Sequence, residues 1–224
     1  MPTAFGQAML DTITGVPQTF RMNMLHGPSI EMHCKDFIQL RTEEQNLLDS
    51  IRLPDGGNVL DWGCGIGRHL AYLRRKYPSV NCVGIDICEL MLEYCRQTIS
   101  PPANFYLSRD NLDDRKYDLI MLIGNNLGVF GNEQESETAL RFLIESLNSN
   151  GKILIETGNP FGKDYFSSQF TIDYRDHHDG PFTWGYSDRH WISRQLQMNN
   201  CHVDIMPSNA PGGIFFFAIG CRNQ

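Results

Sequence analysis

The sequence has no long apolar run and no concentrated cluster of positive charge. No stretch approaches the roughly 18 apolar residues that a membrane span needs, and the first fifteen residues, MPTAFGQAMLDTITG, lack the basic start and apolar core of a secretion signal. The formal net charge is -7, and the longest basic run is Arg74-Arg75-Lys76. We therefore expect a soluble, cytoplasmic protein that binds no membrane and whose affinity does not come from nucleic-acid phosphates.

The sequence also has no CxxC pair, and its number of cysteines is odd. Such spacing favours neither a disulfide framework nor a zinc site. We predict that all the cysteines are reduced and structural, and that the protein holds no metal. They are Cys34, Cys64, Cys82, Cys88, Cys95, Cys201 and Cys221.

From residue 58 almost to the end, short apolar runs alternate with helical patterns. This alternation predicts an α/β fold, in which helices cover a mostly parallel sheet. The linker PSNAPGG between the last two strands predicts that the final strand runs antiparallel. Strands are expected over residues 59–62, 81–86, 104–107, 117–123, 152–156, 202–206 and 214–221, and helices over 68–77, 90–98, 133–147 and 187–199.

Two segments lie outside this alternation. Residues 1–52 end in a predicted helix over 43–51, and its start, Thr42-Glu43-Glu44-Gln45, has capping-box form. Residues 157–186 alternate aromatic with polar residues, and the Asp179-Gly180 pair predicts the turn of a hairpin. Both segments are expected at the edge where parallel strands end, which is where open α/β sheets bind ligands.

The most informative stretch is the glycine turn after the first strand, residues 58–69, NVLDWGCGIGRH. A dinucleotide-binding turn has the spacing GxGxxG, whereas here the third glycine comes one residue early. An acidic residue, Asp61, also precedes the first glycine, where it would repel a phosphate. A zwitterionic amino-acid end fits better, with its carboxylate on the N–H groups of the turn and its ammonium or an ordered water near Asp61. The alternative is that Asp61 only bonds the backbone of the turn.

This stretch resembles motif I of the class I methyltransferases that use S-adenosylmethionine. The resemblance extends over about residues 58–221 and implies a Rossmann-like, seven-stranded, mostly parallel sheet with helices on both faces. It implies S-adenosyl-L-methionine as the cofactor and assigns five residues of the turn to its site: Asp61, Gly63, Cys64, Gly65 and Gly67.

The resemblance continues after the second and third strands. Asp86 stands where the family has an acidic residue that receives the ribose hydroxyls, and Ile87 would lie against the adenine. Asp110 would accept the adenine amino group, and the backbone of Asn111 or Leu112 would contact the ring edge. The alternatives are that Asp86 caps the next helix and that Asp110 only forms a turn.

The turn after the fourth strand reads Gly124-Asn125-Asn126-Leu127, and the resemblance places Asn125 beside the methionine part of the cofactor. Family members that methylate base nitrogens or a glutamine amide carry Asn/Asp-Pro-Pro-aromatic here, and this sequence does not. Asn159-Pro160-Phe161 follows the fifth strand instead and lacks the second proline. We therefore expect a small-molecule acceptor.

The resemblance divides a single domain into four parts. Residues 1–52 form an N-terminal helical lid, 53–156 the cofactor-binding core, 157–186 an inserted hairpin that serves as a substrate lid, and 187–224 the C-terminal half of the core.

The resemblance implies methyl transfer to an O or N atom by in-line displacement, which chiefly requires alignment. A general base would help, and the two candidates are His33 and Glu156. Three alternatives stay open: a peptide or protein acceptor, a protein that binds the cofactor without catalysis, and an NAD-dependent oxidoreductase, which the glycine spacing disfavours. Monomer and homodimer are both compatible with the sequence.

Overall fold

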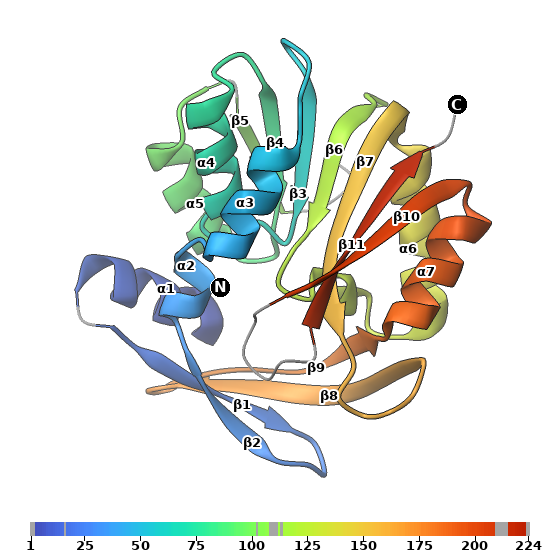
Figure 1. Ribbon diagram of the computed structural model, residues 1–224. Coiled ribbons are helices and arrows are strands. Elements are labelled where there is room, and N and C mark those ends of the chain that lie inside the picture. Colours follow the sequence, from blue (N-terminus) through green and yellow to red (C-terminus); the bar gives the residue numbers. More distant parts are fainter. Residues whose placement is uncertain are drawn as a thin grey trace.

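The computed structural model describes residues 3–15, 17–101, 103–107, 112, 114–208 and 215–222, and its core is a seven-stranded sheet (Figure 1). The strands of this core sheet are β3 (Asn58–Trp62), β4 (Asn81–Ile85), β5 (Ala103–Tyr106), β6 (Tyr117–Leu122), β7 (Leu147–Gly158), β10 (Cys201–Pro207) and β11 (Phe215–Arg222). Their order is β10-β11-β7-β6-β3-β4-β5. Only β11 runs antiparallel to its neighbours, so the predicted sheet and the direction of its last strand are confirmed.

Helices cover both faces of the core sheet. One face carries α3 (Thr42–Ser50), α4 (Arg68–Lys76) and α5 (Glu89–Thr98), and the other carries α6 (Glu133–Glu145) and α7 (Arg189–Met198) (Figure 1). Strand β6 shows why both faces are covered, since Leu119 and Met121 pack in the cluster with α3, α4 and α5, while Ile120 and Leu122 pack in the cluster with α6 and α7. An apolar run of this kind requires burial on both sides.

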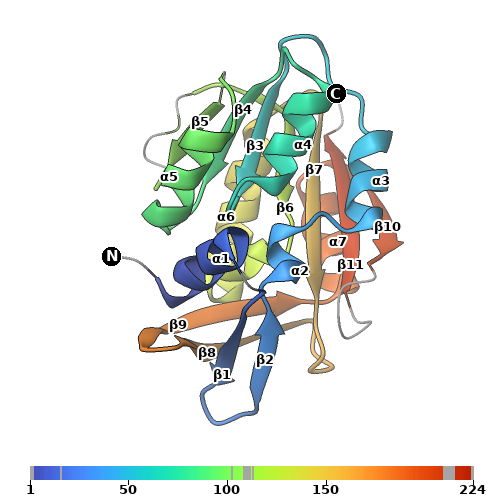
Figure 2. The ribbon, with the colours of Figure 1, turned by 90° about the vertical axis from the view of Figure 1, so that its left-hand side faces the viewer.

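A second sheet, here called the cap sheet, lies across the carboxyl ends of β6 and β7 (Figures 1 and 2). It is antiparallel and has the order β2-β1-β8-β9. Its strands are β1 (Thr19–Met24), β2 (Ser29–His33), β8 (Tyr165–Tyr174) and β9 (His177–Ser187). The predicted insertion after the fifth strand is therefore a hairpin, as expected, but it continues into strands from the N-terminal segment.

The prediction of a purely helical N-terminal lid was wrong. Helices α1 (Ala4–Thr14) and α2 (Lys35–Ile38) flank the hairpin β1-β2. Its signal was present in the sequence, because Phe20, Met22 and Met24 alternate with polar residues at the period of a strand. Met22 and Met24 pair with β8 from the distant insertion, and Phe20 packs against Phe5 of α1, which local patterns do not reveal.

Three predicted local features also lie elsewhere. The hairpin turns at Arg175-Asp176, and the Asp179-Gly180 pair lies inside β9 beside a bulge. The helix predicted over 187–199 begins later, because α7 is capped by Asp188, which accepts from the N–H groups of His190 and Trp191.

The third correction concerns the start of α3. Its N-cap is Arg41 rather than Thr42, and Glu44 accepts the backbone N–H of Arg41 at 2.8 Å. The capping-box glutamate is therefore used, but one residue out of the predicted register.

The cap sheet and α1 are fastened to the core by a third apolar cluster. It joins Ala4, Ala8 and Met9 of α1, Phe20 and Tyr174 of the cap sheet, and Cys88 and Met91 at the start of α5. Cys88 directly follows the turn after β4, so this cluster brings the N-terminal segment over the carboxyl end of the core sheet.

Within the described ranges, no helix is both long and apolar enough to cross a membrane. The seven cysteines are all unpaired, and six of them are buried.

The core packing gives a stability prediction for α6. Leu140 is 0% exposed, and Leu140→Ala should lower the free energy of unfolding by about 2–5 kcal/mol because the cavity cannot fully collapse. Urea denaturation measures this change. Thr138→Ala, at an exposed position of the same helix, is the control and should stay within about 0.5 kcal/mol. Equal losses in the two variants would contradict this description of the core.

Candidate functional site

The order of the core sheet reverses between β3 and β6, and two turns follow these strands. Such a reversal opens a crevice beyond the carboxyl ends of the strands, where open α/β sheets bind ligands. The glycine turn follows β3, and Gly124 and Asn125 follow β6. The sheet topology therefore brings together the two segments that the sequence predicted.

The N–H groups of the glycine turn are largely used within the protein. Those of Gly63 and Cys64 donate to the carbonyl of Ile85 at 2.8 and 2.9 Å, and that of Gly65 donates to Asp86 Oδ2 at 2.8 Å. The expectation that a ligand carboxylate rests on these N–H groups is therefore not supported. The turn instead contributes to the site through the shape of its backbone.

Gly63 and Gly65 shape the turn in different ways. A Cβ at Gly63 would lie 2.5 Å from Cγ of Asn126, whose amide donates to the Gly63 carbonyl at 2.8 Å. A Cβ at Gly65 would meet no atom within 4 Å, so the backbone there borders open space. Gly63 is needed for contact with η2 (Asn126–Phe130), while Gly65 leaves room for a ligand.

The other two glycine-turn residues have packing roles. A Cβ at Gly67 would lie 2.4 Å from Ile99 Cδ1, so this glycine lets α4 begin close to α5. Cys64 is buried beside Cys95. Their interaction and burial raise the pKa of the Cys64 thiol, which keeps it protonated and unreactive.

Asp86 supports the glycine turn from the end of β4. Its two oxygens accept N–H groups from Gly65 at 2.8 Å and from Cys88 at 2.9 Å. Burial raises the pKa of this carboxyl. The helix-capping alternative and the ligand-binding role are thus compatible, since each oxygen has a second lone pair.

The neighbouring predicted residues have different surroundings. Ile87 is 75% exposed, so an apolar surface is open beside Asp86. Leu112 packs at the edge of the cluster that includes Tyr117 and Ile120. Asp110 and Asn111 lie outside the described residues.

Asp61 lies fully buried in β3, and its two oxygens differ. Oδ2 lies 3.3 Å from Nδ1 of His69, whereas Oδ1 has no hydrogen-bond partner among the described residues. A buried carboxylate oxygen without a donor is costly. Because the residue directly precedes the glycine turn, Oδ1 is an acceptor that a donor group of a ligand could use there.

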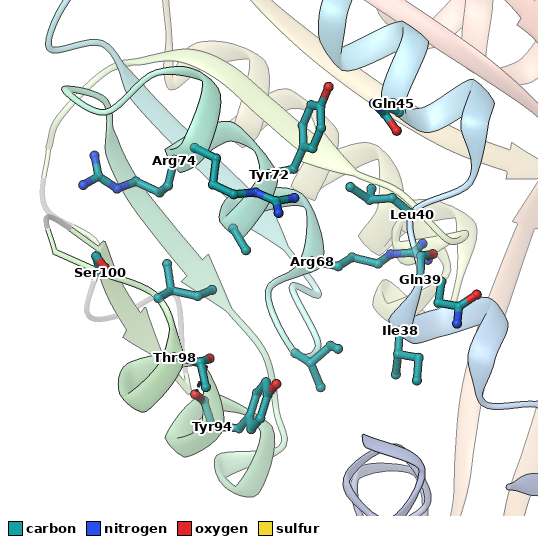
Figure 3. Close-up of a pocket in the computed structure, with 14 residues that line it drawn as sticks. Ile38, Gln39, Leu40, Gln45, Arg68, Tyr72, Arg74, Tyr94, Thr98 and Ser100 are labelled. Atoms are coloured by element: carbon teal, nitrogen blue, oxygen red, sulfur yellow. Dashed lines mark hydrogen bonds between the residues drawn. The ribbon is translucent and has the colours of Figure 1, made fainter. Parts of the chain in front are cut away.

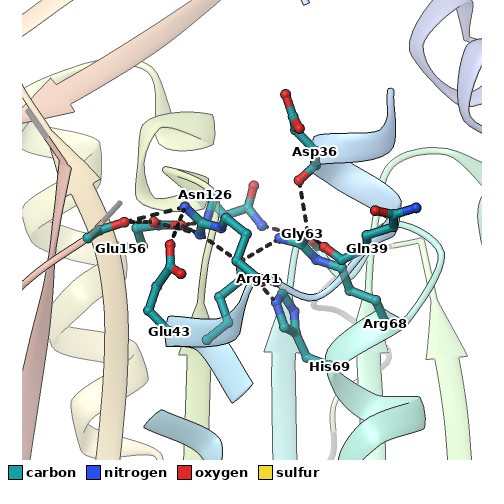
Figure 4. A network of polar contacts seen from close by, with 12 residues as sticks. Asp36, Gln39, Arg41, Glu43, Gly63, Arg68, His69, Asn126 and Glu156 are labelled. Carbon is teal, nitrogen blue, oxygen red and sulfur yellow. Dashed lines mark hydrogen bonds and ion pairs between the residues drawn. The ribbon is translucent and has the colours of Figure 1, made fainter. Parts of the chain in front are cut away.

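Asp61 belongs to a buried network of charged side chains that the sequence did not predict (Figure 4). Glu44 Oε1 accepts from Arg41 at 2.6 Å and from Arg68 at 2.7 Å. The network joins α3, the start of α4, β3 and β7. Its members are Arg41, Glu43, Glu44, Asp61, Arg68, His69 and Glu156.

Glu44 illustrates how strongly the network is coupled. Burial alone would raise its pKa, but the nearby His69, 3.7 Å away, together with Arg68 and Arg41, lowers it to about 2. This carboxylate is therefore held ionised in the interior.

Glu156, one of the two predicted bases, is fully engaged in this network. Arg41 Nη2 lies 2.7 Å from both its oxygens, Ser208 donates to Oε1 at 2.5 Å, and the Gly124 N–H donates to Oε2 at 2.9 Å. The geometry gives Glu156 the role of holding Arg41 and the turn after β6, and it does not favour proton abstraction.

His33, the other predicted base, does not reach the site. It pairs with Thr19, while its neighbour Met32 pairs with Phe20. Successive residues of a strand face opposite sides, and Phe20 faces α1 in the third apolar cluster. His33 therefore lies on the outer face of the cap sheet, where it is exposed.

Asn125 contacts the cap sheet rather than an open crevice. Its amide donates to the Gly185 carbonyl at 3.1 Å, and its oxygen accepts from Thr157 at 2.9 Å. Its backbone has φ 60°, a conformation that asparagine tolerates. Asn126 is the residue of this pair that contacts the glycine turn. Among the described residues, no group of three or more His, Cys, Asp or Glu side chains is arranged to hold a metal.

A separate groove of 660 Å³ lies between the segment joining α2 to α3 and the outer sides of α4 and α5 (Figure 3). Arg68, Tyr72 and Tyr94 are among the residues that line it. None of the predicted site residues does, so this groove is distinct from the switch point, the place where the order of the sheet reverses between β3 and β6.

Comparison with known proteins agrees with the fold. Residues 59–151 match the family model described as "Methyltransferase domain". The chain also superposes on a solved S-adenosylmethionine-dependent methyltransferase from Bacteroides fragilis, in complex with S-adenosyl-L-homocysteine, with a TM-score of 0.80 and 20% sequence identity; the match covers 100% of this chain and 98% of that one. The resemblance to the class I methyltransferases and their Rossmann-like fold is confirmed.

Similarity to curated relatives is confined to part of each protein. The chain is 31% identical over 116 residues to the ribosomal RNA small subunit methyltransferase C of Stutzerimonas stutzeri, which is 49% of this chain and 34% of that protein. It is 39% identical over 64 residues to the trans-aconitate 2-methyltransferase of Variovorax paradoxus, 29% of this chain and 24% of that protein. The chain thus spans about a third or less of the length of these relatives.

The network predicts how stability depends on pH. The pKa of Glu44 is about 2 in the fold against 4.5 when unperturbed, so its contribution is fully present above about pH 5 and is lost as the pH falls toward 2. The loss amounts to about 3 kcal/mol. Denaturation midpoints measured across this range should fall less steeply in Glu44→Gln than in the wild type.

Glu93→Gln, at an exposed position of α5, is the matched control and should follow the wild type. A Glu44→Gln profile parallel to the wild type would show that this carboxylate is not held ionised by the network.

Proposed function

We propose that this chain, which carries a methyltransferase domain on the class I fold, transfers a methyl group from S-adenosyl-L-methionine to an O or N atom of a small molecule. The observation that carries the proposal is the buried, unpartnered Asp61 Oδ1 beside the glycine turn, in a site roofed by the cap sheet. The unpartnered Asp61 oxygen supports the cofactor assignment, and the cap sheet supports the small-molecule acceptor.

The residues of the switch point fit the cofactor. Asp61 Oδ1 provides an acceptor for its amino group, the open face of Gly65 provides room, and the remaining lone pairs of Asp86 suit a ribose diol. Ile87, largely exposed, offers an apolar surface to the adenine. The bound cofactor supplies an electrophilic sulfonium methyl, and the chain supplies its orientation.

The acceptor side is built from the inner face of the cap sheet. Strand pairing puts Phe170 opposite both Met24 and Phe182, and the ring centroid of Phe170 lies 6.1 Å from that of Tyr186. The Phe5 N–H donates to Asp179 on this face, so the face turns toward α1 and the core. An aromatic roof excludes water, which favours attack by the acceptor.

Tyr186 adds a polar group to this roof. Its hydroxyl has no hydrogen-bond partner among the described residues, and burial raises its pKa to about 12. The phenol therefore stays protonated and serves as a donor to an acceptor molecule rather than as a base. Phe161, in the loop after β7, extends this aromatic surface, and its ring centroid lies 5.8 Å from that of Tyr186.

Catalysis by this chain rests mainly on alignment. Glu156 is held by Arg41 and His33 faces outward, so neither is placed to take a proton. Positioning in a dry pocket alone accounts for a large part of the rate enhancement of a displacement. We therefore expect the acceptor to lose its proton to solvent before or after transfer.

A nucleic-acid acceptor fits less well. The similarity to ribosomal RNA methyltransferases covers 49% of the chain, whereas the cap sheet roofs the site and the net charge is -7. RNA binding draws on phosphate contacts with a positive surface. A small acceptor under the roof needs no such surface.

The cofactor assignment predicts that Asp86→Ala weakens S-adenosylhomocysteine binding by about 1–3 kcal/mol, because two backbone N–H groups and the ribose lose their acceptor. Isothermal calorimetry measures the affinity. Asp204→Ala, at an exposed position on β10, should bind like the wild type. Unchanged affinity in Asp86→Ala would place the ribose elsewhere, and tighter binding of NAD than of S-adenosylhomocysteine would refute the cofactor.

The acceptor assignment predicts where a labelled methyl group goes. After incubation with methyl-labelled S-adenosylmethionine, label should appear in a small-metabolite fraction and not in peptides or ribosomal RNA. With the acceptor found in this way, Tyr186→Phe should lower kcat/KM for it and leave S-adenosylhomocysteine affinity unchanged.

Tyr94→Phe, which alters the separate groove, is the control and should retain wild-type kcat/KM. Label in peptide or RNA only would contradict the small-molecule acceptor.

A further inference from the structure

The imidazole of His69 lies between two buried carboxylates. Nδ1 is 3.3 Å from Asp61 Oδ2, and Nε2 is 3.7 Å from Glu44 Oε1. His69 is 5% exposed, and both acids are 0% exposed. Figure 4 shows the ring of His69 directed into the network beside Arg41 and Arg68.

The charges of the fully buried carboxylates and the two guanidinium groups balance when this imidazole is protonated. The guanidinium groups, which stay charged in proteins, are those of Arg41 and Arg68, and the fully buried carboxylates are those of Glu44, Asp61 and Glu156. A fourth carboxylate, Glu43, lies 3.8 Å from Arg41 and is partly exposed to solvent. An uncompensated buried charge is expensive, so the protonated ring stabilises the network.

The groups that face His69 act in opposite directions. Burial lowers the pKa of the ring, but the charge and hydrogen bond of Asp61 and the close approach of Glu44, 3.7 Å from Nε2, outweigh burial, and the net pKa is raised. Arg68 opposes this rise. The carboxylates therefore favour the charged form of the ring in the ligand-free protein.

The cofactor would bring a competing cation to the same carboxylate. Asp61 Oδ2 contacts His69, whereas Oδ1 is buried without a partner. In the proposed function this oxygen receives the amino group of S-adenosylmethionine, which is an ammonium at neutral pH. Asp61 then has a cation on each side, the imidazolium of His69 and the ammonium of the cofactor.

We propose that His69 is a positioning residue that carries the balancing proton of the cofactor site and releases it when the cofactor ammonium binds Asp61. The Nε2–H bond of the imidazolium breaks, the proton passes to the buffer, and the neutral ring keeps its Nδ1–H toward Asp61. Asp61 thereby stays ionised and fixed in both the ligand-free and the cofactor-bound protein. This inference rests on the proposed function.

The release of a proton when the ammonium binds determines how cofactor affinity depends on pH. At low pH the imidazolium persists and repels the incoming ammonium, so cofactor affinity should rise as the pH rises through the titration of His69. Above about pH 8 the ammonium itself loses its proton, and the affinity should fall again.

Calorimetry of S-adenosylhomocysteine binding tests the exchange without any turnover. Titrations between about pH 6 and 7.5, in buffers of different ionisation enthalpy, give the number of protons released. The wild type should release up to about one proton per site, and His69→Asn should release none and lose the rise of affinity with pH. His190→Asn, exposed on α7, is the matched control and should release as many protons as the wild type.

A second ligand tests the same point in the unaltered protein. 5′-Methylthioadenosine has the nucleoside but no amino-acid end, so its binding should release no proton. Release with both ligands, release by neither, or equal release by His69→Asn would overturn the role of His69 while leaving the cofactor assignment intact. Failure of S-adenosylhomocysteine to bind would instead refute the proposed function.

Discussion

The site depends on one partly buried guanidinium, that of Arg41. Its Nη2 lies 2.6 Å from Glu44 and 2.7 Å from both oxygens of Glu156. Arg41 therefore joins α3 to strand β7. Removing either partner would leave a buried charge unpaired, which costs several kcal/mol. Arg68 continues this linkage, because it donates to Glu44 and to the carbonyls of Asp36 and Gln39. The N-terminal segment is thereby held against the glycine turn.

This linkage divides the site into two chemical halves. On the core side, charged groups balance one another around Asp61 and leave one oxygen for a cationic ligand group. On the cap side, Phe170, Phe182 and Tyr186 form an aromatic surface on which the Tyr186 hydroxyl is a donor. A polar binding site for the cofactor and a water-excluding aromatic surface for the acceptor molecule suit a displacement whose rate depends on alignment and on the absence of water. The Asn125 contact with Gly185 connects the halves.

The sequence predicted the core sheet well because its signals are local. Each strand is an apolar run, each helix has a buried stripe, and the glycine spacing belongs to one turn. The cap sheet was only half predicted, since β1 gains burial by pairing with β8, roughly 150 residues away along the chain. The charge network was missed for the same reason. Arg41, Glu44 and His69 look like ordinary helix-surface residues until the fold brings three separate segments together.

The site residues show the same limit. Asp61, Gly65 and Asp86 lie together as the motif predicted, because strand order fixes their positions. The choice of Asn125 over Asn126, and of His33 as a base, depended on the direction of side chains, which only the register of the cap sheet decides.

A crystal structure with S-adenosylhomocysteine would test the central claim most directly, namely that the switch point under the cap sheet is the cofactor site. We predict the amino group of the ligand within hydrogen-bond distance of Asp61 Oδ1 and its sulfur beneath the inner face of the cap sheet. Density for the ligand in the groove beside Arg68 and Tyr94, with Asp61 Oδ1 still unpartnered, would contradict it.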